Sequence, residues 1–149
     1  MTNSTLIRKV YLNCPICDKS HEVEERQRIA KIIIKDDEIE YKEEYYYCPN
    51  VTDDEENEFE LPYMTNENLL AARNAYRIKH GLLTSNDIVE IRENYDLSQV
   101  EFARLMGWGE ATISRYESKA IQDEAYDTML RLVKDSPLEA MEMLEKNRN

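Results

Sequence analysis

Three cysteines carry the clearest chemistry in this sequence, and two of them stand close together. Cys14 and Cys17 form a Cys-x-x-Cys pair, and Cys48 follows much later, again directly before a proline. An odd number of cysteines is a poor basis for a disulfide framework, whereas two thiolates at this spacing can bind one metal ion. The pattern therefore predicts a zinc site that includes Cys14, Cys17 and Cys48.

The fourth ligand of such a site is not obvious from the sequence. A complete zinc ribbon would have a cysteine at position 51, where this chain has Val51. His21, four residues after Cys17, can supply a ring nitrogen, and Asp53 or Asp54 can supply a carboxylate from an acidic loop. Structural zinc nearly always has four protein ligands. The alternative is that no metal binds and that the cysteines are small core residues. A thioredoxin-like redox role is disfavoured, because no βαβ pattern surrounds the pair.

A second group of residues has the spacing of two short helices joined by a tight turn. Ser98 and Glu101 form a capping box, in which each side chain satisfies a free backbone N–H at the start of a helix. Gly107 stands where a tight turn needs a positive φ. The next helix is predicted to begin near residues 109–110, with Ile113 and Tyr116 on its inward face. The pattern predicts a helix-turn-helix.

The polar residues left outside this packing are candidates for contact with DNA: Gln99, Thr112, Ser114, Arg115 and Lys119. In a helix-turn-helix the second helix enters the major groove of DNA. Arg115 can donate two hydrogen bonds to a guanine, and Thr112 can pack on a thymine methyl group or bond a base edge. Gln99 is placed to touch a phosphate or a base, and Lys119 the backbone. The alternative is that Arg115 pairs with a nearby carboxylate and that the helices form a scaffold for protein contacts.

The elements expected around these residues give an α+β protein. Residues 6–12 and two long antiparallel strands between residues 21 and 47, joined by a turn at 35–37, predict a small β-hairpin domain of the zinc-ribbon kind. Residues 52–60 predict a solvated loop. A helix from Thr65 to a stop at Gly81 predicts a linker. The rest predicts an all-α domain of five helices, so that the domains are 1–63, the linker 64–83, and 84–149.

The charge of the chain argues against indiscriminate binding to nucleic acid. The net charge is −12; residues 1–63 hold 8 Lys and Arg against 16 Asp and Glu, and residues 64–149 hold 11 against 15. The acidic N-terminal part either faces a basic partner or keeps the protein soluble. No apolar segment approaches the about 20 residues of a membrane span, so we expect a cytoplasmic protein with no membrane contact. No residues resemble an active site, and we expect no enzyme.

Two resemblances add to this interpretation. The segments Leu97-Ser98-Gln99, Ala103 to Gly107 and Ile113-Ser114-Arg115-Tyr116-Glu117 resemble the Cro/CI (Xre-type) repressor domain. Together with Cys14-Pro15-x-Cys17 and Cys48-Pro49, the whole chain is similar to the MqsA/YgiT-type antitoxins. That resemblance implies a homodimer held by the C-terminal domain, which binds a palindromic operator and represses its own operon. It also implies an N-terminal zinc-binding domain that neutralises a toxin, often one that cleaves mRNA.

Other functions remain open on the sequence alone. The chain can be a stand-alone regulator of phage or mobile-element genes, with an N-terminal domain that senses a signal or binds another protein. It can also be a protein-interaction scaffold without a DNA function. Tyr45, Tyr46 and Tyr47 can form a toxin-binding patch, although core and strand packing is the expected use of at least two of them.

Overall fold

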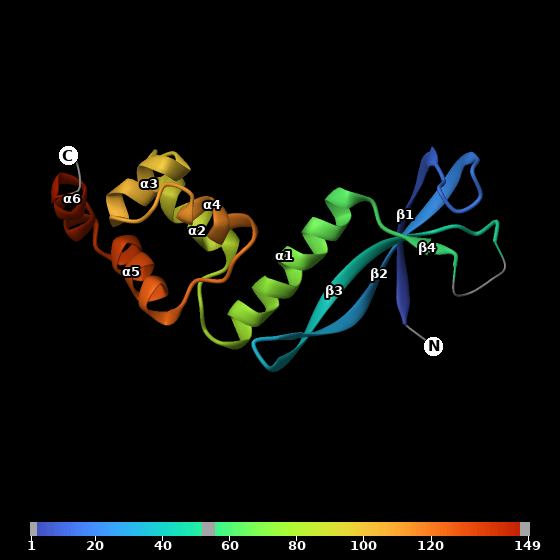
Figure 1. The fold of residues 1–149 in the computed structure, drawn as a ribbon, viewed down its shortest axis with the longest axis horizontal. Helices are drawn as coiled ribbons and strands as arrows, with labels where there is room; N and C mark the ends of the chain where they lie inside the picture. The colour runs from blue at the N-terminus through green and yellow to red at the C-terminus, as the bar shows by residue number, and fades with distance from the viewer. Residues whose placement is uncertain (1–2, 52–55, 147–149) are drawn as a thin grey trace. The chain divides into compact units, whose positions relative to one another are not determined.

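The computed structural model describes residues 3–51 and 56–146, which form two compact units, Met1–Ala75 and Tyr76–Asn149. The first unit contains an antiparallel sheet and the second consists of helices (Figure 1). This arrangement confirms the predicted α+β class. The domain boundaries expected at residues 63 and 83 stay a prediction. Among the described helices, none has the length and apolar character that crossing a membrane requires.

The sheet of the first unit is built in chain order, β1-β2-β3-β4, with antiparallel neighbours. Its strands are β1 (Ser4–Asn13), β2 (Ser20–Ile34), β3 (Asp37–Tyr47) and β4 (Glu58–Phe59). Lys35 and Asp36 join β2 to β3 with φ values of 49° and 64°, as in the two-residue turns that match the twist of a hairpin. The turn is one residue shorter than expected, because Asp37 already pairs with Ile34.

The core of the first unit lies at the end of the sheet that carries the cysteines. Cys14, Val23, Tyr46, Cys48 and Met64 are buried together. Tyr45 is buried as well, so two of the three consecutive tyrosines are packing residues. The segment 52–60, expected to be a loop throughout, contains the short strand β4, which pairs with Tyr46 and Tyr47. Packing against a formed sheet, rather than local sequence, explains this strand.

Helix α1 (Pro62–Lys79) starts three residues earlier than Thr65, with a proline at its first position, where the missing N–H costs nothing. Asn68 fastens the helix to the sheet, because its amide accepts a hydrogen bond from Glu44 N (2.9 Å) and donates one to Glu44 O (2.8 Å). The helix is followed by Gly81 at φ +71°, the expected stop. Its last four residues belong to the second unit.

The second unit contains α2 (Ser85–Asn94), α3 (Gln99–Met106), α4 (Thr112–Ser118), α5 (Glu124–Asp135) and α6 (Pro137–Lys146). The predicted capping box of Ser98 and Glu101 is present, and Gly107 ends α3 at φ 74°. The helices enclose one apolar core, which includes Ile88, Ile91, Phe102, Ala103, Leu105, Met106, Ile113, Leu130 and Val133. Helix α4 begins at Thr112, later than the expected start at 109–110, and Ala111 before it has no side-chain cap.

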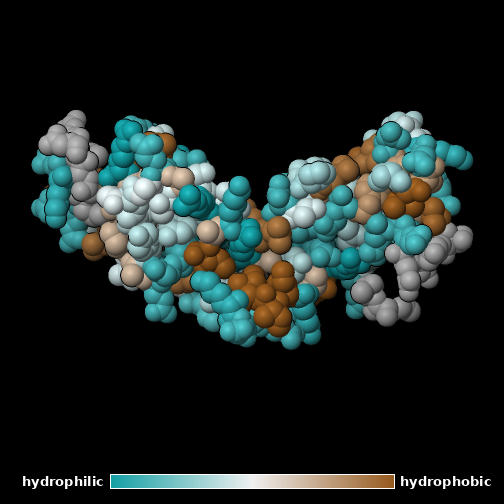
Figure 2. Space-filling view, viewed as in Figure 1, coloured by the Kyte–Doolittle hydropathy of each residue, from teal (hydrophilic) through white to brown (hydrophobic). Residues whose placement is uncertain are grey.

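Nearly all charged side chains of the described residues reach solvent. Of the charged residues in these ranges, Glu25, Arg77 and Asp127 are buried. The face of the molecule in Figure 2 is mainly hydrophilic, with separate apolar groups. The charge of the described residues is therefore carried mainly by the surface, and a surface of this sign disfavours non-specific attraction to nucleic acid.

Candidate metal centre and nucleic-acid interface

The three cysteines and His21 come together in the first unit. Cys14 and Cys17 lie in the turn between β1 and β2, His21 lies on β2, and Cys48 follows β3. One ligand atom from each of the four residues lies within 4.8 Å of the others. The turn is closed by hydrogen bonds from Cys14 N to Lys19 O and from Asp18 N to Cys14 O, both 2.9 Å long. All three cysteines are free thiols.

The ring of His21 is oriented as a ligand would need. Its Nδ1 lies 2.8 Å from Glu22 O, and because a carbonyl oxygen only accepts, Nδ1 is the protonated nitrogen. The lone pair of Nε2 is then available, and Nε2 lies 3.6 Å from Cys48 Sγ. Zn–S and Zn–N bonds of about 2.3 and 2.0 Å in a tetrahedron place sulfur and nitrogen about 3.5 Å apart. The observed separation matches that value.

The protonation of the cluster also suits metal binding. Burial raises the pKa of the Cys14 thiol, but hydrogen bonds from the Cys17 and Ile16 backbone and from His21 outweigh it, and the pKa falls to about 7. The neighbouring Cys14 raises the pKa of His21. Burial raises the pKa of Cys48. A bound cation would compete with protons for these ligand atoms.

Three sulfurs and one ring nitrogen form a Cys₃His set, one of the sets of structural zinc sites. The cluster can therefore hold a metal ion. His21 is the residue that joins the cysteines, while Val51 packs against the apolar core of the unit. Asp53 and Asp54, the other candidates for the fourth ligand, lie outside the described residues.

An ion pair joins α2, the helix before the helix-turn-helix, to α4, the second helix of the helix-turn-helix. Arg92 on α2 donates from Nε and Nη2 to the two carboxylate oxygens of Glu117 on α4, at 2.9 and 3.0 Å. Gln99 Nε2 donates to the same carboxylate at 3.1 Å, and Arg92 Nη1 also bonds Leu97 O. This network joins α2, α3 and α4. The ion pair raises the pKa of Arg92, which stays charged at every physiological pH.

An aromatic cluster holds the other side of α4. Trp108, in the loop before α4, stacks on Tyr126 of α5 with ring centroids 4.4 Å apart. Tyr116 of α4 meets both rings edge-on, at 6.1 and 6.0 Å. Rings at these separations are in favourable contact. The short helix α4 is thus packed on two sides, and this leaves a solvent-facing side.

The structure places the sequence-predicted DNA contacts on or beside α4. Arg115 and Lys119 are exposed, while Thr112 and Ser114 are half-buried. Thr112 and Arg115 are three residues apart on a helix and share one side. Among the residues that the structure describes, the Arg115 guanidinium has neither a hydrogen bond nor an ion pair. Gln99 is partly engaged through its bond to Glu117 and keeps its amide oxygen available.

Sequence reasoning missed two arginines that position α4. Arg92 gave no signal beyond its place in the last turn of α2. Arg77 is fully buried and bonds residues near the end of α4, although it lies on a helix expected to be a linker. The sequence separations are 25 residues for Arg92–Glu117 and 39 for Arg77–Tyr116. The spacing of residues within one helix does not indicate hydrogen-bond partners that lie so far away in the sequence.

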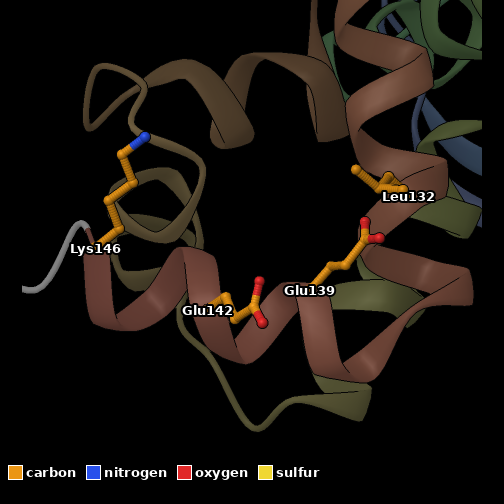
Figure 3. Close-up of a pocket in the computed structure, with 4 residues that line it drawn as sticks. All are labelled: Leu132, Glu139, Glu142 and Lys146. Atoms are coloured by element: carbon orange, nitrogen blue, oxygen red, sulfur yellow. The ribbon is translucent and has the colours of Figure 1, made fainter.

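A shallow hollow between α5 and α6 stands apart from both candidate sites. It is lined by Leu132 on α5 and by Glu139, Glu142 and Lys146 on α6 (Figure 3). Its lining combines two carboxylates, one ammonium group and an exposed leucine, and none of the sequence-predicted DNA contacts is among the lining residues.

Comparison with known proteins defines the class of the second unit. Residues 88–124 match the family model described as helix-turn-helix. The matched residues cover most of α2 and all of α3 and α4. Searches of the curated proteins and of the solved structures gave no match. The matched segment is a helix-turn-helix of the Cro/CI type, and the match supports the class of DNA-binding transcriptional regulators.

Proposed function

We propose that this protein is a sequence-specific transcriptional repressor that reads double-stranded operator DNA with α4. The observation that carries the proposal is the helix-turn-helix match over residues 88–124, with the guanidinium of Arg115 on the solvent side of α4. Repression follows when the operator overlaps the promoter of the chain's own operon. The protein acts by binding and not by catalysis.

Each predicted contact has a defined task in this proposal. Arg115 donates to guanine O6 and N7, and Thr112 contacts the neighbouring base pair. Lys119, at the end of α4, and Gln99, at the start of α3, contact phosphates. Ser114 makes an additional polar contact with the DNA. Residues 64–149 have a net charge of −4, which weakens their attraction to DNA. One set of these few contacts is therefore not enough, and a second set is needed. A homodimer on a palindromic operator supplies the second set.

The experiment measures binding to the DNA upstream of the chain's own gene, at stated salt. We expect Arg115→Ala to lose about 1–3 kcal/mol of specific binding. Lys134→Ala removes the same charge from an exposed position on α5 and serves as the matched control, with no specific loss. Unchanged binding by Arg115→Ala would show that α4 does not read the bases. Absence of specific binding by the wild-type chain would exclude the repressor.

The finer part of the proposal is that the protein is the antitoxin of a type II toxin–antitoxin system. It rests on the resemblance to MqsA/YgiT-type antitoxins and on the acidic first unit, which suits a basic toxin. The test expresses the product of each adjacent gene, alone and together with this chain. We expect one product to arrest growth and this chain to relieve the arrest. If no adjacent product is toxic, the chain is a stand-alone regulator.

We further propose that the metal is zinc and that its role is structural, with Cys14, Cys17, Cys48 and His21 as ligands. Structural zinc contributes directly to the folding free energy of small domains. Protein purified without chelator should contain about one zinc per chain. His21→Ala should lose most of it, while His80→Ala, at an exposed position after α1, should retain it. Less than about a tenth of an equivalent in wild type would exclude zinc.

A further inference from the structure

Arg77 is the largest fully buried side chain in the described part of the protein, with a relative exposure of 0%. It lies in the last turn of α1, three residues before His80 and the stop at Gly81. Burying a guanidinium is costly unless its donors are satisfied. Arg77 Nη2 donates to Tyr116 O at 2.8 Å and to Ala120 O at 2.7 Å, and its Nε donates to Gln122 Oε1 at 3.0 Å.

Two acceptors of Arg77 lie at the C-terminal end of α4, Tyr116 O in its last turn and Ala120 O just after it. A helix leaves its last carbonyl groups without partners inside the helix, and these groups carry the negative end of the helix dipole. Helix α4 has only seven residues and no side-chain cap at its start. A short helix of this kind has little stability of its own. A cation that binds the terminal carbonyl groups of α4 therefore contributes much of the interaction energy that fixes the direction of this helix.

The guanidinium is itself held in one orientation by a buried network. Gln122, whose oxygen accepts from Arg77, donates from Nε2 to Leu83 O at 2.8 Å and to Asp127 Oδ1 at 3.0 Å. Asp127 also accepts from Leu83 N and from Arg131 Nε. Gln122, which accepts from Arg77 Nε, is thereby anchored to Asp127 on α5 and to Leu83 in the segment before α2. The planar guanidinium of Arg77 connects this buried hydrogen-bond network to α4.

We propose that Arg77 is a positioning residue for sequence reading by α4, so that the last turn of α1 is a working part of the DNA-binding unit. The carbonyl that Arg77 holds belongs to Tyr116, the residue next to Arg115. A displacement of that peptide moves the Arg115 side chain relative to a base edge, and bidentate hydrogen bonds tolerate little displacement. Contacts to phosphates are less demanding in geometry. This inference rests on the proposed function of α4.

The test compares binding of the full chain to its upstream DNA and to an unrelated duplex of equal length. Arg77→Lys keeps the charge but loses the planar fork that reaches both Gln122 and α4. We expect at least a tenfold loss of binding to the upstream DNA and a change of less than twofold for the unrelated duplex. Val133→Ala, in the same core on α5, lowers stability and is the matched control. Its ratio of the two affinities should stay within twofold of wild type.

An unchanged ratio for Arg77→Lys, when the wild-type chain discriminates between the two duplexes, would overturn the inference. No discrimination by the wild type would instead refute the proposed function.

A second measurement, on the wild-type protein, tests the inference even if the Arg77→Lys variant does not fold. The amides of Lys119 and Ala120 both bond Arg115 O. We expect their hydrogen exchange to be within about tenfold of the Phe102 amide. Exchange more than a hundredfold faster would mean that the end of α4 opens freely, and would also overturn the inference.

Discussion

The ion pair between Arg92 and Glu117 should contribute a large share of the stability of the helical unit, and Glu117→Gln tests this. The Glu117 side chain is 5% exposed and that of Arg92 is 18% exposed. Breaking a fully buried pair costs about 3–5 kcal/mol, because one charge is left without its partner. Arg92 keeps partial contact with water and its bond to Leu97 O. The expected loss for the isosteric change is therefore lower, about 2–3 kcal/mol.

The assay is thermal unfolding followed by tryptophan fluorescence. The chain has a single tryptophan, Trp108, which lies in the helical unit, so the signal reports on that unit alone. For a unit of this size, 1 kcal/mol corresponds to a shift of about 4–8 °C in the melting temperature, which predicts a decrease of about 8–24 °C. The chain supplies a matched control in Glu110→Gln. Its partner is Arg104, and their side chains are 65% and 64% exposed.

An exposed pair of this kind contributes about 0–1 kcal/mol, so Glu110→Gln should change the unfolding free energy little. The reasoning is refuted if Glu117→Gln costs no more than Glu110→Gln. A loss of operator affinity without a loss of stability would also contradict it, because that result would assign Glu117 to the DNA contact rather than to the packing of α4.

Two further predictions concern the same helical unit. Burial raises the pKa of Asp127, but hydrogen bonds from Arg131, the Leu83 amide and Gln122 outweigh this effect, and the pKa lies below its ordinary value of 3.8. The Asp127 carboxylate therefore stabilises the fold above pH 3.8. This stabilisation is lost as the pH falls through the lowered pKa. Fluorescence unfolding between pH 2 and about 6 should show this loss in wild type and not in Asp127→Asn, and equal pH dependence in both would contradict it. Gly81→Ala should cost about 1 kcal/mol, since φ is +71° although the space is open, whereas Gly109→Ala should be nearly neutral because its Cβ would lie 3.5 Å from Thr112 Oγ1. Equal melting temperatures for the two glycine variants would contradict the second prediction.

The sequence predicted the features whose causes lie within a few residues of one another. The capping box of Ser98 and Glu101 and the positive φ of Gly107 and Gly81 need only local geometry, and all are present. The long hairpin was predicted from residue type and period. The boundaries differed by one to three residues, at Asp37, Pro62 and Thr112, because side-chain caps and pairing across strands decide where an element ends.

Only the tertiary structure decided which distant groups meet. The cysteine spacing indicated three ligands, but the presence of His21 beside them depends on Cys48 and His21, 27 residues apart, coming together at one end of the sheet. The ion-pair partner of Arg92 and the acceptors of Arg77 are 25 to 45 residues away in sequence. A local pattern fixes the type and face of a helix, whereas its exact direction is set by buried charges and hydrogen bonds between elements. The helix-turn-helix was visible in the sequence; the arginines that bond to its second helix became visible only in the folded chain.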